Sequence, residues 1–203
     1  YVTTAPPWSD PNLPHLTRRL TGRAIVAAVR SATPGIPSGP AAVAPFVDRD
    51  LALAHNGYLN GFEGPVGRRL IESLPDDLHG RLEIRSDSLA LFLLAVAHRR
   101  HRPDQSLDAL LARVCGQAAE LAREAGLAAS LNFIACDGRH LAATRCAHGV
   151  ASNTLYVRQD GGDWPSGSIL LASEPLDAAH EWQAVPDGHR LLADRSMLQI
   201  AAL

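Results

Sequence analysis

The chain has 203 residues, of which 46% are apolar and 20% are charged, and its formal net charge is −2. This length suits one domain with a complete core, and this charge offers no electrostatic attraction for nucleic acid. No apolar run is long enough to cross a bilayer and the first residues do not form a secretory signal, so we expect a cytoplasmic protein with no membrane partner. All 19 basic residues are arginine, which excludes a P-loop lysine or a Schiff-base lysine within these residues.

The first third of the chain alternates apolar runs with loops. Residues 1–22 are polar and rich in proline, which predicts a loop that leads into the domain. Residues 23–30 (RAIVAAVR) have a continuous apolar run between two arginines, as is typical of a strand buried on both faces, and a Gly/Pro loop follows them. A second buried strand is predicted at residues 51–55 (LALAH), where Asn56 and Gly57 then form the commonest kind of turn pair.

The middle of the chain has helical signals. The pattern predicts a short helix, a loop and two long helices, at residues 64–74, 76–85, 86–101 and 105–126. Ser86 or Asp87 is the candidate N-cap of the first long helix, which is apolar nearly all round and should be buried. Gly126 is placed to end the second long helix as its C′ glycine.

After Gly126 the apolar period changes to two, which predicts strands. Short strands divided by DG, GG and PDG turns are expected at residues 130–136, 140–146, 153–159, 168–174, 189–194 and 197–201. The order of strands, then two helices, then more strands indicates an α+β fold with packed sheets. The chain has no internal repeat or low-complexity linker, so we expect a single domain over residues 1–203.

Neither the histidines nor the cysteines indicate a metal site. His98 and His101 have a spacing that could share a metal ion, but Arg99 and Arg100 lie between them, and positive charge is favoured at the helix end predicted there. The three cysteines, Cys115, Cys136 and Cys146, are widely spaced in apolar surroundings, which favours reduced core thiols. We therefore expect no metal and no cofactor.

Four residues could together bind an α-amino acid that carries an acyl group in its side chain. Arg30 could hold a carboxylate, and Asp87 could hold an ammonium group. The amide of Asn56 and the backbone N–H of Gly57 could form an oxyanion hole. Alternatively, Arg30 is an ordinary surface arginine, Asp87 is a helix cap, and Asn56 and Gly57 form an ordinary turn. The residues alone do not decide between the functional and the structural interpretation.

The sequences of several segments, and their order along the chain, resemble those of a known family. VRSAT, APF, LAHNG and SDS, with a buried helix after the last, resemble the class II glutamine amidotransferases, which are N-terminal nucleophile hydrolases. LNFIACDG, LLASEPLD with EW, and VPDGH narrow the resemblance to the amidohydrolases of ergothioneine biosynthesis, which remove a γ-glutamyl group from γ-glutamyl-hercynylcysteine sulfoxide. The resemblance covers about Arg23 to Leu203.

The resemblance implies a four-layer αββα sandwich and a role for each candidate residue. Arg30 matches the residue that holds the glutamyl α-carboxylate, with Ser31 and Thr33 in the same substrate-binding stretch. Asp87 matches the residue that holds the α-amino group, and Asn56 and Gly57 match the oxyanion pair. The implied reaction is acyl transfer to a cysteine, followed by hydrolysis of the thioester.

The chain departs from the family pattern in two respects. The family carries its nucleophilic cysteine at the processed N-terminus, whereas this chain opens at Tyr1, so we expect the nucleophile segment to lie outside the given residues. The ammonia-transferring members usually have a tryptophan and a histidine where this chain has Ser31 and Pro34, which favours a stand-alone hydrolase over a transferase.

These observations predict an enzyme that hydrolyses a γ-glutamyl amide and releases glutamate, with γ-glutamyl-hercynylcysteine sulfoxide as the leading substrate. The alternatives are a glutaminase, a hydrolase of another γ-glutamyl amide, and a non-catalytic γ-glutamyl-binding domain without its nucleophile. The expected partner is this small molecule, and a homodimer is the candidate assembly.

Overall fold

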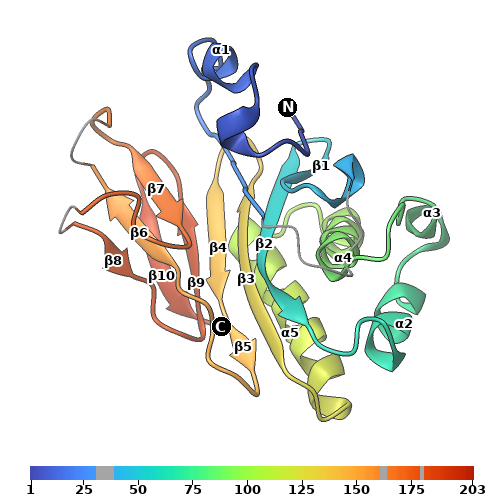
Figure 1. The fold of residues 1–203 in the computed structure, drawn as a ribbon. Coiled ribbons are helices and arrows are strands. Elements are labelled where there is room, and N and C mark those ends of the chain that lie inside the picture. The colour runs from blue at the N-terminus through green and yellow to red at the C-terminus, as the bar shows by residue number, and fades with distance from the viewer. Residues whose placement is uncertain (31–38, 161–163, 179–180) are drawn as a thin grey trace.

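Two antiparallel sheets and a layer of helices make up the computed structural model, which describes residues 1–30, 39–160, 164–178 and 181–203 (Figure 1). The helices are α1 (Leu13–Thr17), α2 (Pro65–Glu72), α3 (Asp76–His79), α4 (Asp87–His101) and α5 (Leu107–Glu124), with 3-10 turns at Pro7–Ser9 and Pro40–Ala42. The strands are β1 (Phe46–Asp48), β2 (Leu51–Leu59), β3 (Ala129–Cys136), β4 (Leu141–Arg145), β5 (Ala147–His148), β6 (Tyr156–Gln159), β7 (Ile169–Ala172), β8 (Gln183–Ala184), β9 (His189–Ala193) and β10 (Leu198–Ala202).

The large sheet is seven-stranded, in the order β1-β2-β3-β4-β9-β10, with β5 paired to β3. The small sheet has the order β7-β6-β8. Helices α4 and α5 contact one face of the large sheet, and Figure 1 shows the small sheet on the side away from them. The described residues therefore form a helical layer and two sheet layers, which confirms the α+β sandwich class expected from the sequence.

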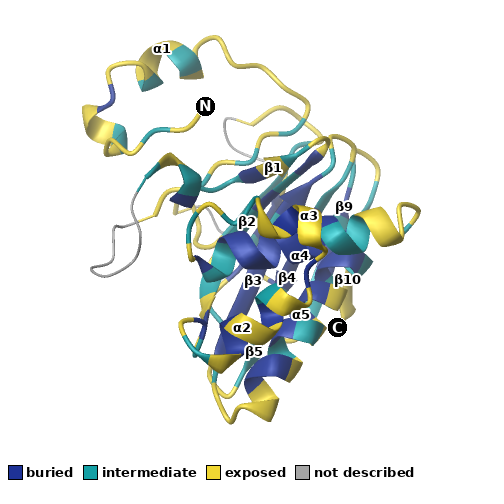
Figure 2. Cartoon of the chain, turned by 90° about the vertical axis from the view of Figure 1, so that its right-hand side faces the viewer, coloured by how far each residue is buried: buried dark blue, intermediate teal, exposed yellow. Residues whose placement is uncertain are grey.

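The main core lies between the large sheet and the helices. Strand β2 alternates, so that Leu51, Leu53 and Leu59 are buried, as a strand with one face against helices requires. Helix α4 is buried continuously from Leu89 to Val96, which confirms the buried helix predicted from its apolar composition. Figure 2 shows this burial along the sheet and the inner sides of the helices.

A second, smaller core joins the two sheets. Its buried members are Ala143, Leu155, Val157, Val185, Leu191 and Ala193. They come from β4 and β9 of the large sheet, from β6 and the residue before it, and from the residue that follows β8. The small sheet is thereby held over the half of the large sheet farther from β1, while side chains of β2 on the same face are more exposed.

Both predicted helix ends are confirmed. Ser86 caps α4, because its hydroxyl accepts a hydrogen bond from the Leu89 N–H at 3.4 Å. Gly126 has a φ of +65°, and the N–H of Leu127 donates to the Ala122 carbonyl at 2.9 Å, as in a Schellman motif.

Three local predictions were wrong. Strand β2 does not stop at residue 55 but continues through Asn56 and Gly57, because β3 supplies backbone partners up to residue 59. Residues 23–30 are not assigned as a strand: the exposed fractions of Ile25 and Val29 are 69% and 79%, and no strand of the described residues pairs with the segment. The predicted loops over residues 1–22 and 76–85 contain the short helices α1 and α3.

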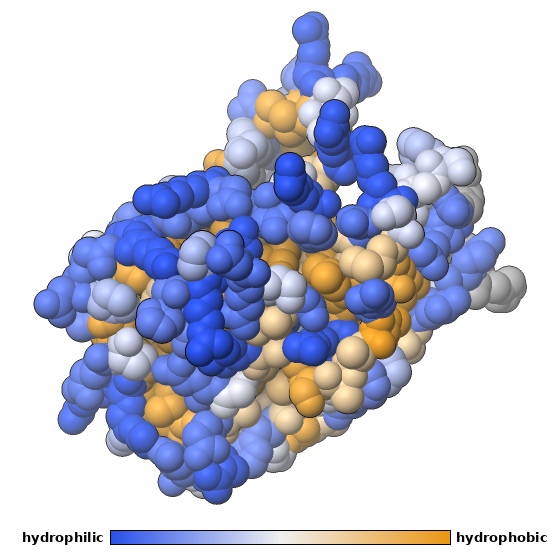
Figure 3. Space-filling model, turned by 180° about the vertical axis from the view of Figure 1, so that it is seen from behind, coloured by the Kyte–Doolittle hydropathy of each residue, from blue (hydrophilic) through white to orange (hydrophobic). Residues whose placement is uncertain are grey.

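Figure 3 shows the rear face of the molecule, where hydrophilic side chains cover much of the surface and apolar side chains are visible in several areas, the largest of them right of centre. Among the described residues, no helix combines the length and the apolar character that crossing a membrane requires. A single domain over residues 1–203 stays a prediction.

Candidate active site

Asn56 and Gly57 lie within β2 (Leu51–Leu59) of the large sheet. Asn56 is directly opposite Asn132 of β3, and Gly57 is opposite Leu131. Because side chains alternate along a strand, Asn56 projects from the face opposite to the buried Leu53 and Leu59, and it is exposed. The predicted oxyanion pair therefore sits on the rigid strand of a sheet, where backbone pairing restricts its movement.

Gly57 is required by a close approach between β2 and β3. A Cβ atom at this position would lie 1.9 Å from the carbonyl oxygen of Ser130 and 2.8 Å from Nε2 of His55. The first separation is far below van der Waals contact with a backbone atom, so no side chain fits without a backbone shift. The HNG sequence is thus explained by packing at Gly57, in addition to any role of its N–H.

Asp87 is tied to the same strand from the N-terminus of α4. Its carboxylate accepts hydrogen bonds from the Leu59 N–H at 2.9 Å and from the Ser88 N–H at 2.7 Å. Leu59 is two residues beyond Gly57, which corresponds to about 7 Å along a strand. The structure therefore brings the predicted amine-binding carboxylate to the end of β2 that carries the predicted oxyanion pair.

His55 is a residue of this site that the sequence reasoning missed. Its ring stacks on Phe133 with ring centroids 4.9 Å apart. Nδ1 is 2.9 Å from the Ser88 hydroxyl and Nε2 is 3.1 Å from the Ser130 carbonyl oxygen, so a neutral ring that donates from Nε2 and accepts at Nδ1 satisfies both contacts. Burial lowers the pKa of His55, against opposing contributions from the Asp87 charge and the Ser130 carbonyl.

The position of His55 directly before Asn56 was the only available signal, and a strand histidine is more often structural. Its hydrogen bonds join three elements, because Ser88 begins α4 and Ser130 lies on β3. His55 thereby connects the strand of the oxyanion pair to the helix that carries Asp87.

Asn153 is a second residue that the sequence reasoning missed. It lies in the loop between β5 and β6, and its Nδ2 donates to Oδ1 of Asn56 at 3.0 Å and to the backbone carbonyl of Asn56 at 3.2 Å. A single loop asparagine has no sequence signal that would distinguish it from an ordinary turn residue. Only the fold brings it to Asn56.

The arginine stretch is only partly described. Arg30 is exposed and is the last described residue before a gap. Ser31 and Thr33, which the resemblance places in the substrate-binding stretch, lie outside the described residues. The assignment of Arg30, Ser31 and Thr33 to the substrate therefore stays a prediction.

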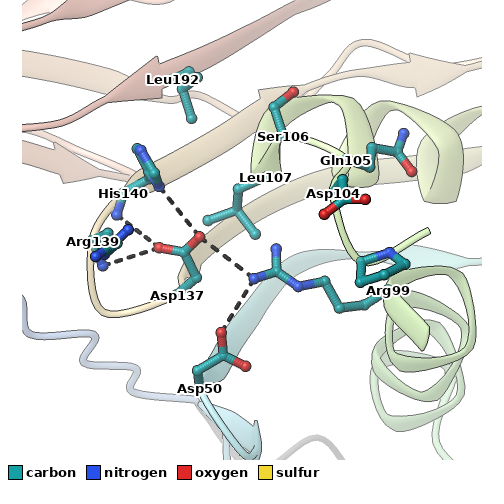
Figure 4. Close-up of a pocket in the computed structure, with 11 residues that line it drawn as sticks. Asp50, Arg99, Asp104, Gln105, Ser106, Leu107, Asp137, Arg139, His140 and Leu192 are labelled. Atoms are coloured by element: carbon teal, nitrogen blue, oxygen red, sulfur yellow. Dashed lines mark hydrogen bonds and ion pairs between the residues drawn. The ribbon is translucent and has the colours of Figure 1, made fainter. Parts of the chain in front are cut away.

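A cavity of about 480 Å³ lies elsewhere, at the other end of α4 (Figure 4). There Arg99 lies between Asp50 and Asp137, with N–O separations of 3.2 Å and 3.7 Å, so these charges largely satisfy one another. Arg99 is twelve residues beyond Asp87 on α4, which is about 18 Å along the helix. This cavity is not the site that Asn56 and Asp87 define.

The three cysteines differ in burial and in the pKa of the thiol: Cys146 is only partly buried, and its hydrogen bond with Cys115 lowers its pKa. All three are free, and Cys115 and Cys136 are buried. Burial raises the pKa of the Cys115 thiol well above its usual range, with a further contribution from Cys146, and a buried neutral thiol is unreactive. Within the part of the chain that the structure describes, no three His, Cys, Asp or Glu residues are grouped so as to hold a metal ion, and the absence of a cofactor stays a prediction.

Sequence comparison finds relatives over nearly the whole chain. A γ-glutamyl-hercynylcysteine sulfoxide hydrolase of Mycolicibacterium smegmatis is 34% identical over 186 residues, covering 91% of this chain and 66% of that protein. A protein of the same name from Mycobacterium tuberculosis is 32% identical over 203 residues, covering 99% of this chain and 72% of that protein. The chain thus spans about two thirds of the length of these relatives. No protein-family model matches it.

Structure comparison agrees on the fold. A glutamine aminotransferase class-II domain protein from Silicibacter pomeroyi has a TM-score of 0.74 at 23% identity, covering 100% of this chain and 84% of that chain. The allosteric regulatory enzyme of purine biosynthesis has a TM-score of 0.53 at 19% identity, covering 86% of this chain and 34% of that chain. These similarities confirm the fold expected from the resemblance to class II glutamine amidotransferases.

Proposed function

The chain belongs to the family of γ-glutamyl-hercynylcysteine sulfoxide hydrolases, and we propose that its site cleaves the γ-glutamyl amide bond of such a conjugate and releases glutamate. The reaction class is hydrolysis by acyl transfer. The α-amino end of the glutamyl group binds Asp87, its α-carboxylate binds Arg30 with Ser31 and Thr33, and its δ-carbonyl lies at Asn56 and Gly57.

The observation that carries the proposal is the hydrogen bond from the Leu59 N–H to Asp87, at 2.9 Å. It ties the amine-binding carboxylate to β2, two residues from Gly57. A glutamyl group has its charged α-substituents at one end and its reacting carbonyl at the other. Strand β2 joins the proposed binding site for the charged end to the proposed site for the reacting carbonyl. The strand keeps the distance between these two sites constant, which suits a glutamyl group.

The charge of Asp87 remains available to a ligand. A carboxylate can accept about four hydrogen bonds, and Asp87 accepts one from Leu59 and one from Ser88, with a weaker contact of 3.3 Å to the Ser88 hydroxyl. These donors fix the orientation of the carboxylate without a counter-charge. A substrate ammonium group would supply that counter-charge.

At the reacting end, Asn56 and Gly57 stabilise the tetrahedral intermediate. A thiolate attacks the δ-carbonyl carbon, and the carbonyl oxygen becomes negatively charged. The Asn56 amide and the Gly57 N–H stabilise this oxyanion by donating hydrogen bonds to it. Collapse of the intermediate expels the amine of the leaving group with a proton. Water then hydrolyses the γ-glutamyl thioester, which releases glutamate and regenerates the thiol.

The thiol in this mechanism belongs to an N-terminal cysteine upstream of Tyr1, whose own α-amino group is the base. This part of the proposal rests on the family resemblance and on the environment of Cys115, which is unsuited to attack because its thiol is buried. The alternative function, γ-glutamyl binding without catalysis, follows if the full protein has no such cysteine.

We propose further that the protein is cytoplasmic and acts without a nucleic-acid or membrane partner, with a homodimer as the candidate assembly. Its near-neutral charge of −2 supports the expected absence of a nucleic-acid partner. The molar mass of the full-length protein in light scattering tests the assembly.

The proposal is tested by measuring free glutamate released by the full-length protein from γ-glutamyl-hercynylcysteine sulfoxide, from the unoxidised γ-glutamyl conjugate and from glutamine. We expect the highest kcat/KM for the sulfoxide and no release after replacement of the N-terminal cysteine by alanine. Equal kcat/KM for glutamine would refute the substrate. Binding of the conjugate without any release would establish the non-catalytic alternative.

A further inference from the structure

The side chain of Asn153 contacts the proposed oxyanion donor from a different part of the fold. Its Nδ2 is 3.0 Å from Oδ1 of Asn56 and 3.2 Å from the Asn56 backbone carbonyl oxygen. One amide nitrogen therefore bridges the side chain and the main chain of the same residue. This bridge restricts rotation of the Asn56 side chain about both of its torsions.

The loop that carries Asn153 is held in place from the large sheet. Nδ2 of Asn132 donates to the Asn153 carbonyl at 2.9 Å and to the Thr154 carbonyl at 3.2 Å. Nε of Arg145 also donates to the Asn153 carbonyl, at 3.0 Å, and NH1 of Arg145 donates to the Val185 carbonyl at 2.6 Å. The backbone carbonyl of Asn153 thus accepts hydrogen bonds from two side chains, which fixes the position of the backbone from which the Asn153 side chain extends.

Asn132, the residue directly opposite Asn56, is itself oriented. Its Oδ1 accepts from the Cys146 N–H at 3.2 Å, which leaves its Nδ2 to bind the loop. Asn132 is 3% exposed, so its amide is sheltered from competing water. The order of contacts therefore runs from a buried amide, through an anchored loop, to the exposed amide of Asn56.

The orientation of the Asn56 amide decides whether it can serve an oxyanion. The carboxamide group of asparagine is planar, and its acceptor oxygen and donor nitrogen point to opposite sides of the Cβ–Cγ bond. When Oδ1 of Asn56 accepts from Asn153, Nδ2 of Asn56 is directed to the other side as a donor. A flipped amide would present an oxygen lone pair to the developing negative charge, which would repel it.

We propose that Asn153 is a positioning residue that sets the orientation of the Asn56 amide for catalysis. This inference rests on the proposed function of Asn56 as an oxyanion donor. Asn153 acts through Asn56 and keeps the donor preorganised before the substrate binds. Its contribution appears in the transition state, where the oxyanion forms, and so it affects kcat more than KM.

The test uses the full-length protein and compares Asn153→Asp, Asn153→Ala and Asn56→Ala for glutamate release from the γ-glutamyl conjugate. Asn153→Asp replaces the donor by an acceptor, which favours the flipped amide. We expect kcat to fall about ten- to a hundredfold, less than the roughly hundred- to thousandfold loss expected when an oxyanion donor is removed outright, with KM changed less than about threefold. The decrease in kcat should be smaller for Asn153→Ala, because this change removes the bridge without favouring the flipped orientation of the Asn56 amide.

The pH dependence distinguishes positioning from a structural role. Once protonated, the carboxyl group that Asn153→Asp introduces can donate again to Oδ1 of Asn56. The kcat of this variant relative to wild type should therefore rise as the pH falls toward about 4–5, near the usual pKa of an aspartate. The matched control is Gln199→Glu, which makes the same amide-to-carboxylate change on β10, at the far edge of the large sheet, and should leave kcat unchanged.

Three outcomes would overturn the inference. They are a kcat within twofold of wild type for both Asn153 variants, a loss confined to KM and thermal stability, and a kcat ratio that does not rise at low pH. The parallel Asn56→Ala measurement separates the two hypotheses. A large loss in Asn56→Ala with none in the Asn153 variants rejects only the positioning role, whereas no loss in Asn56→Ala rejects the proposed oxyanion donor itself.

Discussion

The carbonyl oxygen of Ser130 occupies the space in which a side chain at Gly57 would begin, 1.9 Å from the position of a Cβ atom. The same oxygen accepts the hydrogen bond of His55 at 3.1 Å. One backbone carbonyl therefore both restricts position 57 to glycine and holds the histidine beneath it. The local geometry of the HNG segment depends on its neighbour β3 as much as on its own sequence.

Gly57→Ala should destabilise the protein, because the clash is with backbone and cannot be relieved by a rotamer change. We expect a loss of about 1–3 kcal/mol or more in the free energy of unfolding, measured by urea denaturation. The matched control is Gly116→Ala in α5, where a Cβ atom meets nothing within 4 Å. That variant should stabilise the protein by about 0.5–1 kcal/mol, since alanine favours a helix interior. Equal effects of the two changes would contradict the proposed packing.

Asn56→Ala should lower kcat by about a hundred- to a thousandfold in the full-length protein, because one oxyanion donor is lost. KM should change little, since the ground-state carbonyl carries less charge than the intermediate. Stability should be nearly unchanged because the Asn56 side chain is exposed. Steady-state glutamate release measures both constants, and a variant with wild-type kcat would remove Asn56 from the mechanism.

Asp87→Asn should weaken γ-glutamyl binding while it preserves the fold. The asparagine oxygen can still accept from the Leu59 N–H, but the negative charge for the substrate ammonium group is lost. Removal of one partner of a buried charge contact costs about 2–5 kcal/mol, which predicts a KM raised at least tenfold. Asp104→Asn, at the remote cavity, is the control. A KM within twofold of wild type for Asp87→Asn would show that the carboxylate serves only to bind the Leu59 and Ser88 N–H groups.

Arg30→Ala should also raise KM strongly, because the guanidinium is proposed to bind the α-carboxylate in a bidentate manner. The expected cost is again about 2–5 kcal/mol. Arg23→Ala provides the control, since Arg23 is exposed and lies in the same segment. Calorimetric titration with a γ-glutamyl compound, using a protein without its nucleophile, measures binding directly. Similar affinities for the two variants would mean that Arg30 has no specific role.

The stability of the protein should decrease as the pH falls below about 6.5. Because burial lowers the pKa of His55 in the folded state, the unfolded chain takes up a proton near its ordinary pKa of about 6.5 while the folded chain does not. The unfolded state then binds more protons, and the free energy of unfolding falls by at most about 1.4 kcal/mol per pH unit for this group.

The variant His55→Gln should have a shallower dependence over pH 7.5–5, measured by urea denaturation at each pH. His98, whose pKa burial also lowers, contributes with the same sign in both proteins, so the difference between them isolates His55. An identical slope for His55→Gln would show that the ring titrates in the folded protein as it does in the unfolded chain.

Local patterns predicted most of the elements, because each pattern reflects a local physical preference. The apolar run before His98 predicted a buried helix, and the Ser86 cap and Gly126 end are both present. The predicted end of β2 at residue 55 was wrong because pairing with β3 overrides the turn preference of Asn-Gly. The strand predicted at residues 23–30 was wrong because an apolar run becomes a strand only beside a hydrogen-bonding partner.

The candidate site likewise combines features that the sequence predicts with contacts that only the tertiary structure creates. The fold class and the family could be predicted from the chain, because residue type and order carry that information, whereas the roles of Asn56, Gly57 and Asp87 stay predictions. The contacts of His55 with Ser88 and Ser130 could not be predicted, nor could the approach of Asn153 to Asn56 from 97 residues away. Such contacts depend on strand register and loop anchoring, which arise when distant segments pack together and have no local signal.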